Sequence, residues 1–374
     1  MFGQIHLREI LPSRAHAGNP IRVQKQASNI TISYQTTYPN GKPKPPRFQP
    51  LTATVAPRIA LTEELVETLG LYQGDGQTAT TSKSYQATRF SNSCPELIRQ
   101  FLRVMHTLGV RPRNLKAQVT GSTALQAHTN DASLIHEWSR ITHIPKGLFY
   151  TCRWNRSKYP DSQHVPKGTL SVIYANSSFR LIFDALFNYV RRKATHHPSM
   201  AAAFLRGWIA ADGCMYYSGA HRQLILAAKD PEDRAYARVL LHLLEIKPNQ
   251  NGLRPGKEAV IITGYTNLEQ VRHFRLCELH PEKRAKFTKA FETYRGPSYR
   301  KGEGQTKVIE ALQTQPLSTN TLATSLKRKP NAIRAHLRAL ERVGLVRRAD
   351  SIRTAGTGRP AELWELAVGG EHNG

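Results

Sequence analysis

The fold of this chain is decided by two similar segments, Thr68-Leu-Gly-Leu-Tyr-Gln-Gly-Asp-Gly76 and Leu205-Arg-Gly-Trp-Ile-Ala-Ala-Asp-Gly213. Each is an apolar, small-residue helix pattern that ends in Asp-Gly. The sequence that follows is also alike, because a proline-initiated helix pattern begins at Pro95 in one case and at Pro231 in the other. Such a repeat predicts a duplicated domain. With one carboxylate in each copy, we expect two acids to meet on a pseudo-twofold axis.

The charge of the chain points to a polyanionic partner. The 374 residues carry a formal net charge of +26, and 40% of them are hydrophobic, which is enough for two or three packed domains. Basic residues concentrate in the first 58 positions and between Lys327 and Arg348, where Glu341 is the one acid. An excess of this size favours nucleic acid as the partner over a coat of solubilising lysines.

The cysteines and the apolar runs bear on the cellular setting. Cys94, Cys152, Cys214 and Cys277 are scattered singly without a Cys-x-x-Cys pair, so neither a zinc site nor a disulfide framework is expected. The sequence has no basic start followed by an apolar core, and no apolar run of membrane-spanning length. We therefore expect an intracellular protein, in the cytoplasm, the nucleoid or an organelle matrix, that is not secreted and has no membrane partner.

The chain divides into four predicted parts. Residues 1–58 form a basic N-terminal extension, which we interpret either as a disordered tail or as a DNA-contacting arm. Residues 59–195 and 196–297 are the two repeats, the first with an insertion at about 124–165. Residues 298–374 form a separate module.

Both repeats are predicted to run through a helix, a hairpin, a second helix and a strand. In the first repeat these are a helix with Thr62 as its N-cap and Gly76 at its end, a hairpin at about 78–90, a helix at 95–108 and a strand at 116–120. In the second they are 200–212, 215–228, 231–244 and 260–264. The residues at the ends of the two strands are also alike, Thr120-Gly-Ser-Thr and Thr263-Gly-Tyr-Thr. We therefore expect the strands at 116–120 and 260–264 to be equivalent. The first copy also has a helix at 133–142, a strand at 168–174 and a helix at 179–191.

The C-terminal module has the element order of a winged helix-turn-helix. We expect a helix at 306–313, a second one capped by Ser318, a third at 330–343 and a strand pair at 346–353 and 362–366. The third helix carries Arg334, Arg338 and Arg342 at four-residue steps, and Lys327, Arg328 and Lys329 lead into it. A cationic stripe on this helix favours docking in a DNA major groove over a role in protein contacts.

The two core helices have the residues for a close contact and a metal site. Small residues lie four apart at Gly70 and Gly74, and again at Gly207 and Ala211. This spacing lets helix backbones touch, so Asp75 and Asp212 would lie side by side at two helix C-termini. There the carboxylates repel each other and face the negative ends of two helix dipoles, a conflict that a divalent cation resolves. Hard oxygen ligands with open water positions suit Mg²⁺, although a lone Asp-Gly would more often be a simple turn.

These two segments resemble the LAGLIDADG motif, and residues 59–297 resemble a single-chain, two-repeat LAGLIDADG homing endonuclease. The penultimate aspartate of the motif matches Asp75 and Asp212, and its glycine at the third position matches Gly70 and Gly207. The sixth position, often acidic in that family, is Gln73 or Ala210 here. Arg206, at the second position, is bulkier than usual and is expected to point away from the helix contact.

The resemblance implies an α+β fold, a pseudo-twofold pair of αββαββα repeats whose sheets form a saddle over DNA. It implies catalysis by Asp75 and Asp212 with shared divalent ions, two or three in number. Gly74 and Ala211, the residues before the aspartates, are further candidate metal ligands. Mn²⁺ is expected to substitute for Mg²⁺, and Ca²⁺ to bind without cleavage. The family's active-site lysine matches Lys283, with Lys286 as a competitor and no partner placed in the first repeat. The hairpin residues that we expect to read bases are Gln77, Lys83, Gln86, Arg89, His221, Arg222 and Gln223.

The sequence therefore predicts a site-specific endonuclease that cuts both strands of a long, nearly asymmetric DNA site with Mg²⁺, as a monomer. In this hypothesis each aspartate serves one strand. Two alternatives remain: a non-catalytic DNA-binding transcriptional regulator, and an intron maturase that binds RNA. Because regulators in such families typically lose the aspartates, retention of both favours the nuclease.

Overall fold

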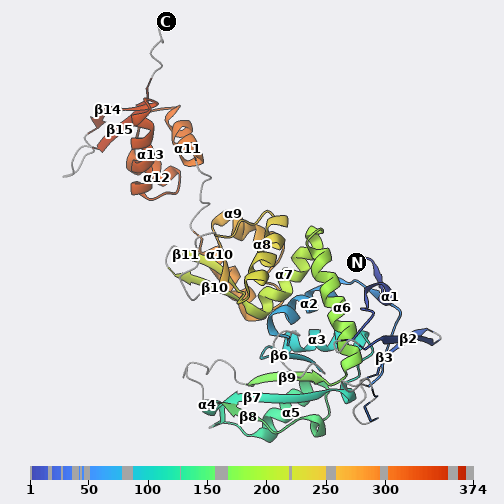
Figure 1. Cartoon of the computed structure of the whole chain (residues 1–374). Coiled ribbons are helices and arrows are strands. Elements are labelled where there is room, and N and C mark those ends of the chain that lie inside the picture. The colour runs from blue at the N-terminus through green and yellow to red at the C-terminus, as the bar shows by residue number, and fades with distance from the viewer. Residues whose placement is uncertain are drawn as a thin grey trace. The chain divides into compact units, whose positions relative to one another are not determined.

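The protein is described by a computed structural model, in which the chain forms two compact units. One contains Met1–Thr263 and Asn267–Phe291, and the other contains Gly264–Thr266 and Glu292–Gly374 (Figure 1). The structure describes residues 2–15, 19–26, 28–35, 42, 44–45, 51–77, 87–126, 128–155, 167–218, 221–249, 258–294, 302–352 and 361–367. None of the helices within these ranges is long and apolar enough to span a bilayer.

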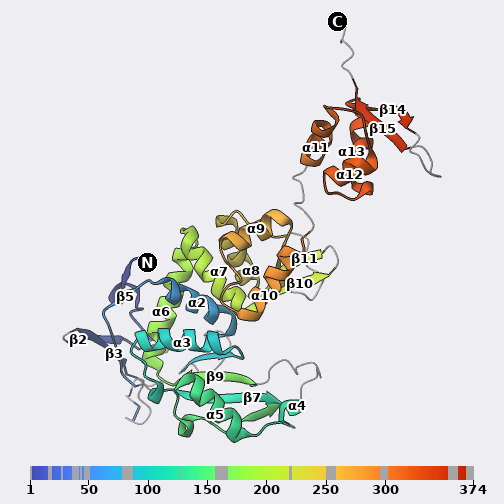
Figure 2. The same ribbon diagram turned by 180° about the vertical axis from the view of Figure 1, so that it is seen from behind.

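The first repeat packs helices against one face of a four-stranded sheet (Figures 1 and 2). Its helices are α2 (Glu63–Asp75), α3 (Pro95–Thr107), α4 (Thr123–Gln126), α5 (Asp131–Thr142) and α6 (Ser177–Ala194). Its strands are β6 (Thr88–Asn92), β7 (Lys116–Ser122), β8 (Arg153–Asn155) and β9 (Thr169–Tyr174), in the order β6-β9-β7-β8. The Thr62 hydroxyl accepts a hydrogen bond from the Leu65 backbone N–H at 3.1 Å, so the predicted N-cap of α2 is confirmed.

The second repeat begins with α7 (Pro198–Asp212), which runs directly into a three-stranded antiparallel sheet. The strands, in sheet order, are β10 (Gly213–Ser218), β11 (His221–Ala227) and β12 (Ala259–Thr263). The remaining helices are α8 (Pro231–Leu243), α9 (Tyr265–His273) and α10 (Pro281–Glu292). The predicted helices and the hairpin are confirmed to within a few residues, because prolines and Asp-Gly pairs mark their ends.

Strand pairing corrects one equivalence between the repeats. The prediction matched the strand at 116–120 with that at 260–264. In the structure β12 pairs directly with β11, whereas β7 does not pair with β6, and the strand next to β6 is β9. The counterpart of β12 is therefore β9. The segment 250–257, where a counterpart of β7 would fall, lies outside the described residues.

The N-terminal extension contains more structure than an arm or a tail. A small sheet of β2 (Ile21–Gln26), β3 (Asn29–Tyr34) and β4 (Ala53–Val55) buries Ile30, Ile32 and Val55. Separately, β1 (Gln4–His6) pairs with β5 (Arg58–Ala60), and the short helix α1 (Leu7–Ile10) follows β1. The alternation of Ile30 and Ile32 with polar residues is a local strand signal. Its partner β2 is mostly polar and its partner β4 has only three residues, so neither stands out in the sequence.

The C-terminal module has the winged helix-turn-helix order expected from the sequence. Helices α11 (Glu303–Leu312), α12 (Thr319–Ser325) and α13 (Pro330–Arg342) enclose a small core, and the Ser318 side chain caps α12. Strands β14 (Val346–Ile352) and β15 (Ala361–Leu366) pair antiparallel, with the two-residue β13 (Leu317–Ser318) on the other edge of β15. Trp364 is 4% exposed and belongs to this core.

Candidate functional site: an acidic pair at the junction of two helices

Helices α2 and α7 pack with their backbones in contact, as the small residues predicted. A Cβ atom on Gly70 would overlap the carbonyl oxygen of Phe204, and one on Gly207 would overlap the carbonyl oxygen of Glu67. Only glycine fits at these two positions without moving the helices apart. The contact therefore fixes where both helices end.

The close contact brings the two aspartates to one place. Asp75 and Asp212 are the last residues of α2 and α7. A Cβ on Gly74 would lie 2.9 Å from Oδ2 of Asp212 and 2.6 Å from Cβ of Ala211, so the Asp212 carboxylate lies directly against the residue before Asp75. The four candidate metal-site residues thus gather at one end of the helix pair.

Lys283 lies beside this acidic pair. Its Nζ donates to the α7 carbonyl oxygens of Ile209, Ala210 and Ala211 at 3.2, 2.6 and 2.7 Å. Lys286, the competing lysine, is exposed. An ammonium at the negative end of α7 counters the helix dipole and the carboxylates together. The Lys283 ammonium also uses one lone pair of the Ala211 carbonyl oxygen, which we predicted as a metal ligand.

Asn92 is a site residue that the sequence did not indicate. The Asn92 side chain, at the end of β6, donates through Nδ2 to Oδ2 of Asp75 at 2.5 Å. Its Oδ1 accepts from the Cys94 backbone N–H at 2.6 Å, just before α3. An asparagine before a helix reads as ordinary turn chemistry, so the sequence carried no signal for a contact with Asp75.

The environment of the pair disfavours two bare carboxylates. Burial raises the pKa of Asp75 to about 6; the Asn92 hydrogen bond and Lys283 act against this rise, whereas the Asp212 charge adds to it. Burial also raises the pKa of Asp212, with Lys283 as the largest opposing influence. Conversely, burial lowers the pKa of Lys283, while Asp75 and Asp212 act to raise it. One ammonium offsets only part of the charge of two desolvated carboxylates.

The donor chemistry at this junction fits a hard divalent cation. Two carboxylates and the carbonyl oxygens at the helix ends are the ligand types that Mg²⁺ and Ca²⁺ take. Among the described residues, no group of three or more His, Cys, Asp or Glu side chains could hold a metal ion. A cation here would therefore depend on Asp75 and Asp212, with water or substrate oxygens completing its shell.

We expected Arg206 to point away from the helix contact, but it does not. Its Nη1 donates to Oε1 of Glu63, at 2.5 Å, and to Oε1 of Glu67, both on α2. Glu67 is in turn bonded by the side chain of Gln100 on α3. The bulky residue is accommodated because it lies at the edge of the helix pair and forms ion pairs across it.

At the other edge Gln73 donates to Asp233 of α8 at 3.1 Å, so polar bonds join the repeats on both sides.

The face of the first sheet opposite the helices is polar and basic. Phe90 of β6 is buried under the helices, so its neighbour Arg89 lies on the open face. Arg89 pairs across the strands with Ile173 of β9, and Ile173 pairs in turn with Lys116 of β7. The next rows hold Ser91, Ser171, Gln118 and Thr120. These β7 and β9 residues were missed by the prediction, although the polar residues of β7 alternate with buried Ala117 and Val119.

The base of the first hairpin is held by a buried arginine. Arg180 of α6, 4% exposed, donates to the Tyr72 hydroxyl at 2.6 Å and to the Ala87 carbonyl at 3.1 Å. The Tyr72 hydroxyl donates to the Gln77 carbonyl at 2.7 Å. Gln77 and Ala87 are therefore tied to the same pair of side chains. The predicted base readers Lys83 and Gln86 lie outside the described residues, whereas Gln77 is described and half-buried.

The second sheet presents a different open face, and one predicted reader is not on it. Arg222 points to the helix side, where Nε donates to the Ala290 carbonyl of α10 at 3.0 Å. Gln223 and His221 do lie on the open face, in the same alternating set as Ile225. Tyr216 of β10, 51% exposed and registered with Gln223, joins them and was not predicted.

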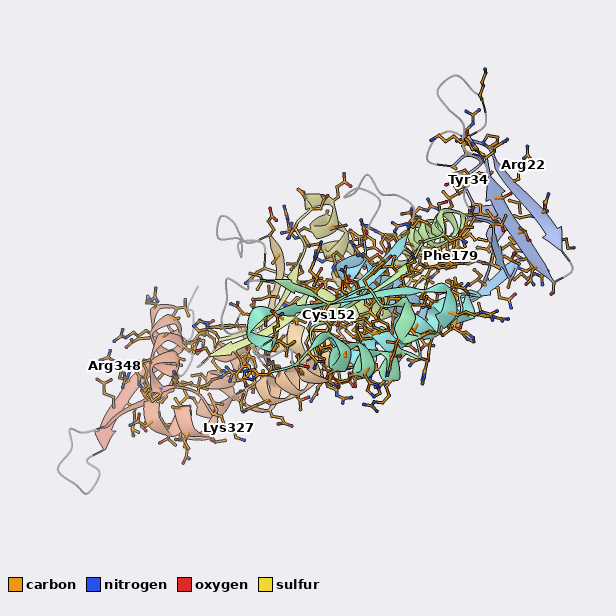
Figure 3. The ribbon with its side chains drawn as sticks, turned by 90° about the horizontal axis from the view of Figure 1, so that it is seen from below. Arg22, Tyr34, Cys152, Phe179, Lys327 and Arg348 are labelled. Atoms are coloured by element: carbon orange, nitrogen blue, oxygen red, sulfur yellow. The ribbon has the colours of Figure 1, made fainter. Side chains whose placement is uncertain are left out.

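In the C-terminal module, the predicted stripe is exposed. Ile333, Leu337 and Leu340 bury one face of α13, and Arg334, Arg338 and Arg342 lie exposed on another. Lys327 and Lys329 are exposed in the turn before α13, and Arg328 is half-buried. Figure 3 shows Lys327 and, on β14, Arg348.

Comparison with known proteins gives one match to a family model. Residues 302–348 match a family described as bacterial regulatory protein, arsR family. No curated protein matches the chain.

Three solved structures are similar to parts of the chain. The N-terminal LAGLIDADG domain of DUF199/WhiA is 15% identical with a TM-score of 0.33, covering 57% of this chain and 79% of that one. Full-length DUF199/WhiA from Thermotoga maritima is 12% identical with a TM-score of 0.35, covering 76% and 93%. Mesophilic variants of the homing endonuclease I-DmoI are 14% identical with a TM-score of 0.34, covering 60% and 96%. Values this low carry no inference about activity.

Proposed function

We propose that the protein is a site-specific double-strand DNA endonuclease that requires a divalent metal ion. The observation that carries the proposal is the position of Asp75 and Asp212 at the adjoining ends of α2 and α7, with Lys283 beside them. Burial raises the pKa of both carboxyl groups, so two carboxylates at this position cost stability. A costly acidic pair at the junction of two pseudo-symmetric halves is typical of a functional site.

Each half supplies one acid for one strand. Asp75 and Asp212 would hold the cations, and Asn92 orients the Asp75 carboxylate through its hydrogen bond. When bound, divalent metal ions activate water and stabilise the leaving oxygen in phosphodiester hydrolysis. Lys283 offsets negative charge where the phosphodiester would lie. Its bonds to three α7 carbonyls hold the ammonium in place.

DNA recognition is assigned to three surfaces. The open faces of the β6-β9-β7-β8 and β10-β11-β12 sheets would read bases in the major groove on the two sides of the cut. The arginine stripe of α13 would bind a further part of the duplex and lengthen the footprint. The net charge of +26 supports a duplex as the partner.

Cleavage by aspartate variants tests the proposal. The chain first selects a site from a randomised duplex library in Ca²⁺, and a supercoiled plasmid with that site is then incubated with Mg²⁺. We expect the natural chain to linearise the plasmid, and Asp75→Asn and Asp212→Asn each to reduce double-strand cutting by about a hundredfold or more while still binding the site. Glu269→Gln, a half-exposed carboxyl of α9, is the matched control. An Asp212→Asn variant that cuts both strands at the full rate contradicts the proposal.

A non-catalytic DNA-binding regulator is the second candidate. Two observations favour it. Lys283 donates a hydrogen bond to the Ala211 carbonyl oxygen, a candidate metal ligand, and residues 302–348 resemble a family of bacterial regulatory proteins. A regulator would bind the selected duplex equally well in EDTA and in Mg²⁺ and leave the plasmid supercoiled. The plasmid assay therefore separates the two functions.

A further inference from the structure

Strand pairing identifies equivalent positions in the two sheets. Phe90 of β6 and Leu226 of β11 are both buried, lie at the same distance before Pro95 and Pro231, and pair with Val172 and Val260 respectively. The residue before each of them must therefore be equivalent as well. Arg89 of the first repeat is therefore equivalent in position to Ile225 of the second.

The equivalent rows differ in chemistry. In the first repeat the row runs from Arg89 through Ile173 to Lys116. In the second repeat it runs from exposed Cys214 through Ile225 to Ile261. The first row carries two cations, and the described part of the second row carries none.

Arg89 lies half-buried on the open face. Its Nε is enclosed by the protein and has no hydrogen-bond partner within the described structure, so no described acceptor holds this nitrogen away from a ligand. In the major groove, a guanidinium donates two parallel bonds to O6 and N7 of guanine.

Ile225 and Ile261 offer the opposite chemistry. Both are half-buried, directly paired, and able to make only apolar contacts. The thymine methyl group is the one apolar feature of the major-groove edge of a base pair, so this pair of side chains favours thymine. Guanine or cytosine there would lose hydrogen bonds to water and gain none from the protein.

We propose that Arg89 and Ile225 make the DNA target asymmetric at positions related by the pseudo-twofold axis. Arg89 reads a guanine in the half-site under the first repeat, and Ile225 with Ile261 packs on a thymine methyl in the half-site under the second. This inference rests on the proposed function, since it requires that the open faces of the sheets contact the major groove.

Selection and base analogues test the inference with the full chain. Selection from a randomised duplex pool in Ca²⁺ should enrich guanine on one side and thymine at the related position on the other. In the selected duplex, 7-deazaguanine removes the N7 acceptor and uracil removes the methyl group, and each should weaken binding by about fivefold or more. These measurements use the unaltered protein, so they hold even if a variant fails to fold.

Exchange variants assign each half-site to its repeat. Arg89→Ile should lose sensitivity to 7-deazaguanine and shift preference at that position alone, and Ile225→Arg should exchange thymine for guanine at the other. Arg99→Ile, a change of an exposed arginine on α3, should leave both sensitivities unchanged. A selected site with the same base at both positions, or binding that ignores both analogues, overturns the inference but not DNA binding. A chain that enriches no duplex at all overturns the inference together with the proposed function.

Discussion

At the scale of single residues, the acidic pair should reduce the stability of the metal-free protein. Burial raises the pKa of Asp75 to about 6, above its ordinary value of 3.8. A carboxyl whose pKa is higher in the folded than in the unfolded chain destabilises the fold fully above the folded pKa, and this cost disappears below the unfolded pKa. A rise of this size corresponds to about 3 kcal/mol. Asp75→Asn should therefore increase the free energy of unfolding by up to that amount at pH 7.5 in EDTA.

Denaturant unfolding, followed by tryptophan fluorescence, measures this difference. The gain should shrink as the pH falls from 6 and should be lost near pH 3.5, because Asp75 is then protonated in both states. Glu269→Gln provides the matched change at a half-exposed carboxyl and should change the free energy of unfolding by no more than about 0.5 kcal/mol. A stability difference between Asp75→Asn and the natural chain that is independent of pH would show that the carboxylate is not the destabilising group.

At the scale of elements, the helix contact makes a sharp prediction. A Cβ on Gly207 would overlap the Glu67 carbonyl oxygen, so Gly207→Ala must separate α2 from α7. We expect it to lower the free energy of unfolding by about 1–3 kcal/mol and to reduce cleavage, since the carboxylates move with the helices. Gly147→Ala is the control, because a Cβ at Gly147 has nothing within 4 Å and its effect should stay within about 0.5 kcal/mol. Calorimetry of both variants tests this; equal stability of the two would argue against close packing.

The same scale shows what the sequence could and could not predict. Helix ends were predictable because local chemistry sets them: Thr62 and Ser318 cap their helices, and Pro95 and Pro231 begin theirs. The meeting of Asp75 and Asp212 followed from the spacing of small residues. Strand partnership was not local, so β12 was equated with the wrong strand.

The directions of side chains were also not predictable from the sequence. Arg222 was assigned to the DNA-reading set because it lies in a hairpin between polar neighbours. In the structure it bonds to the Ala290 carbonyl, a group 68 residues away along the chain. Asn92 was missed for the converse reason, since its partner Asp75 lies on another element. Both cases depend on tertiary packing that no local pattern encodes.

At the scale of the whole molecule, the arginine stripe of α13 should contribute a separable share of DNA affinity. Replacing Arg334, Arg338 and Arg342 together with glutamine should weaken binding to the selected duplex and reduce the slope of log affinity against log salt by up to about 2.7. Arg99→Gln with Arg272→Gln, exposed arginines of α3 and α9, is the control and should change the slope little. Fluorescence anisotropy between about 50 and 200 mM salt measures the slopes. Identical slopes for the stripe variant and the natural chain would remove α13 from the interface.

Anomalous diffraction from crystals of the chain with its selected duplex and Mn²⁺ measures whether the two halves share divalent metal at one acidic junction. We predict anomalous density in contact with the carboxylates of both Asp75 and Asp212, next to a phosphodiester of the duplex. Density that is absent from this junction in a DNA-bound crystal, or a Lys283 ammonium that lies between the two carboxylates in place of a metal ion, would contradict a metal-dependent nuclease.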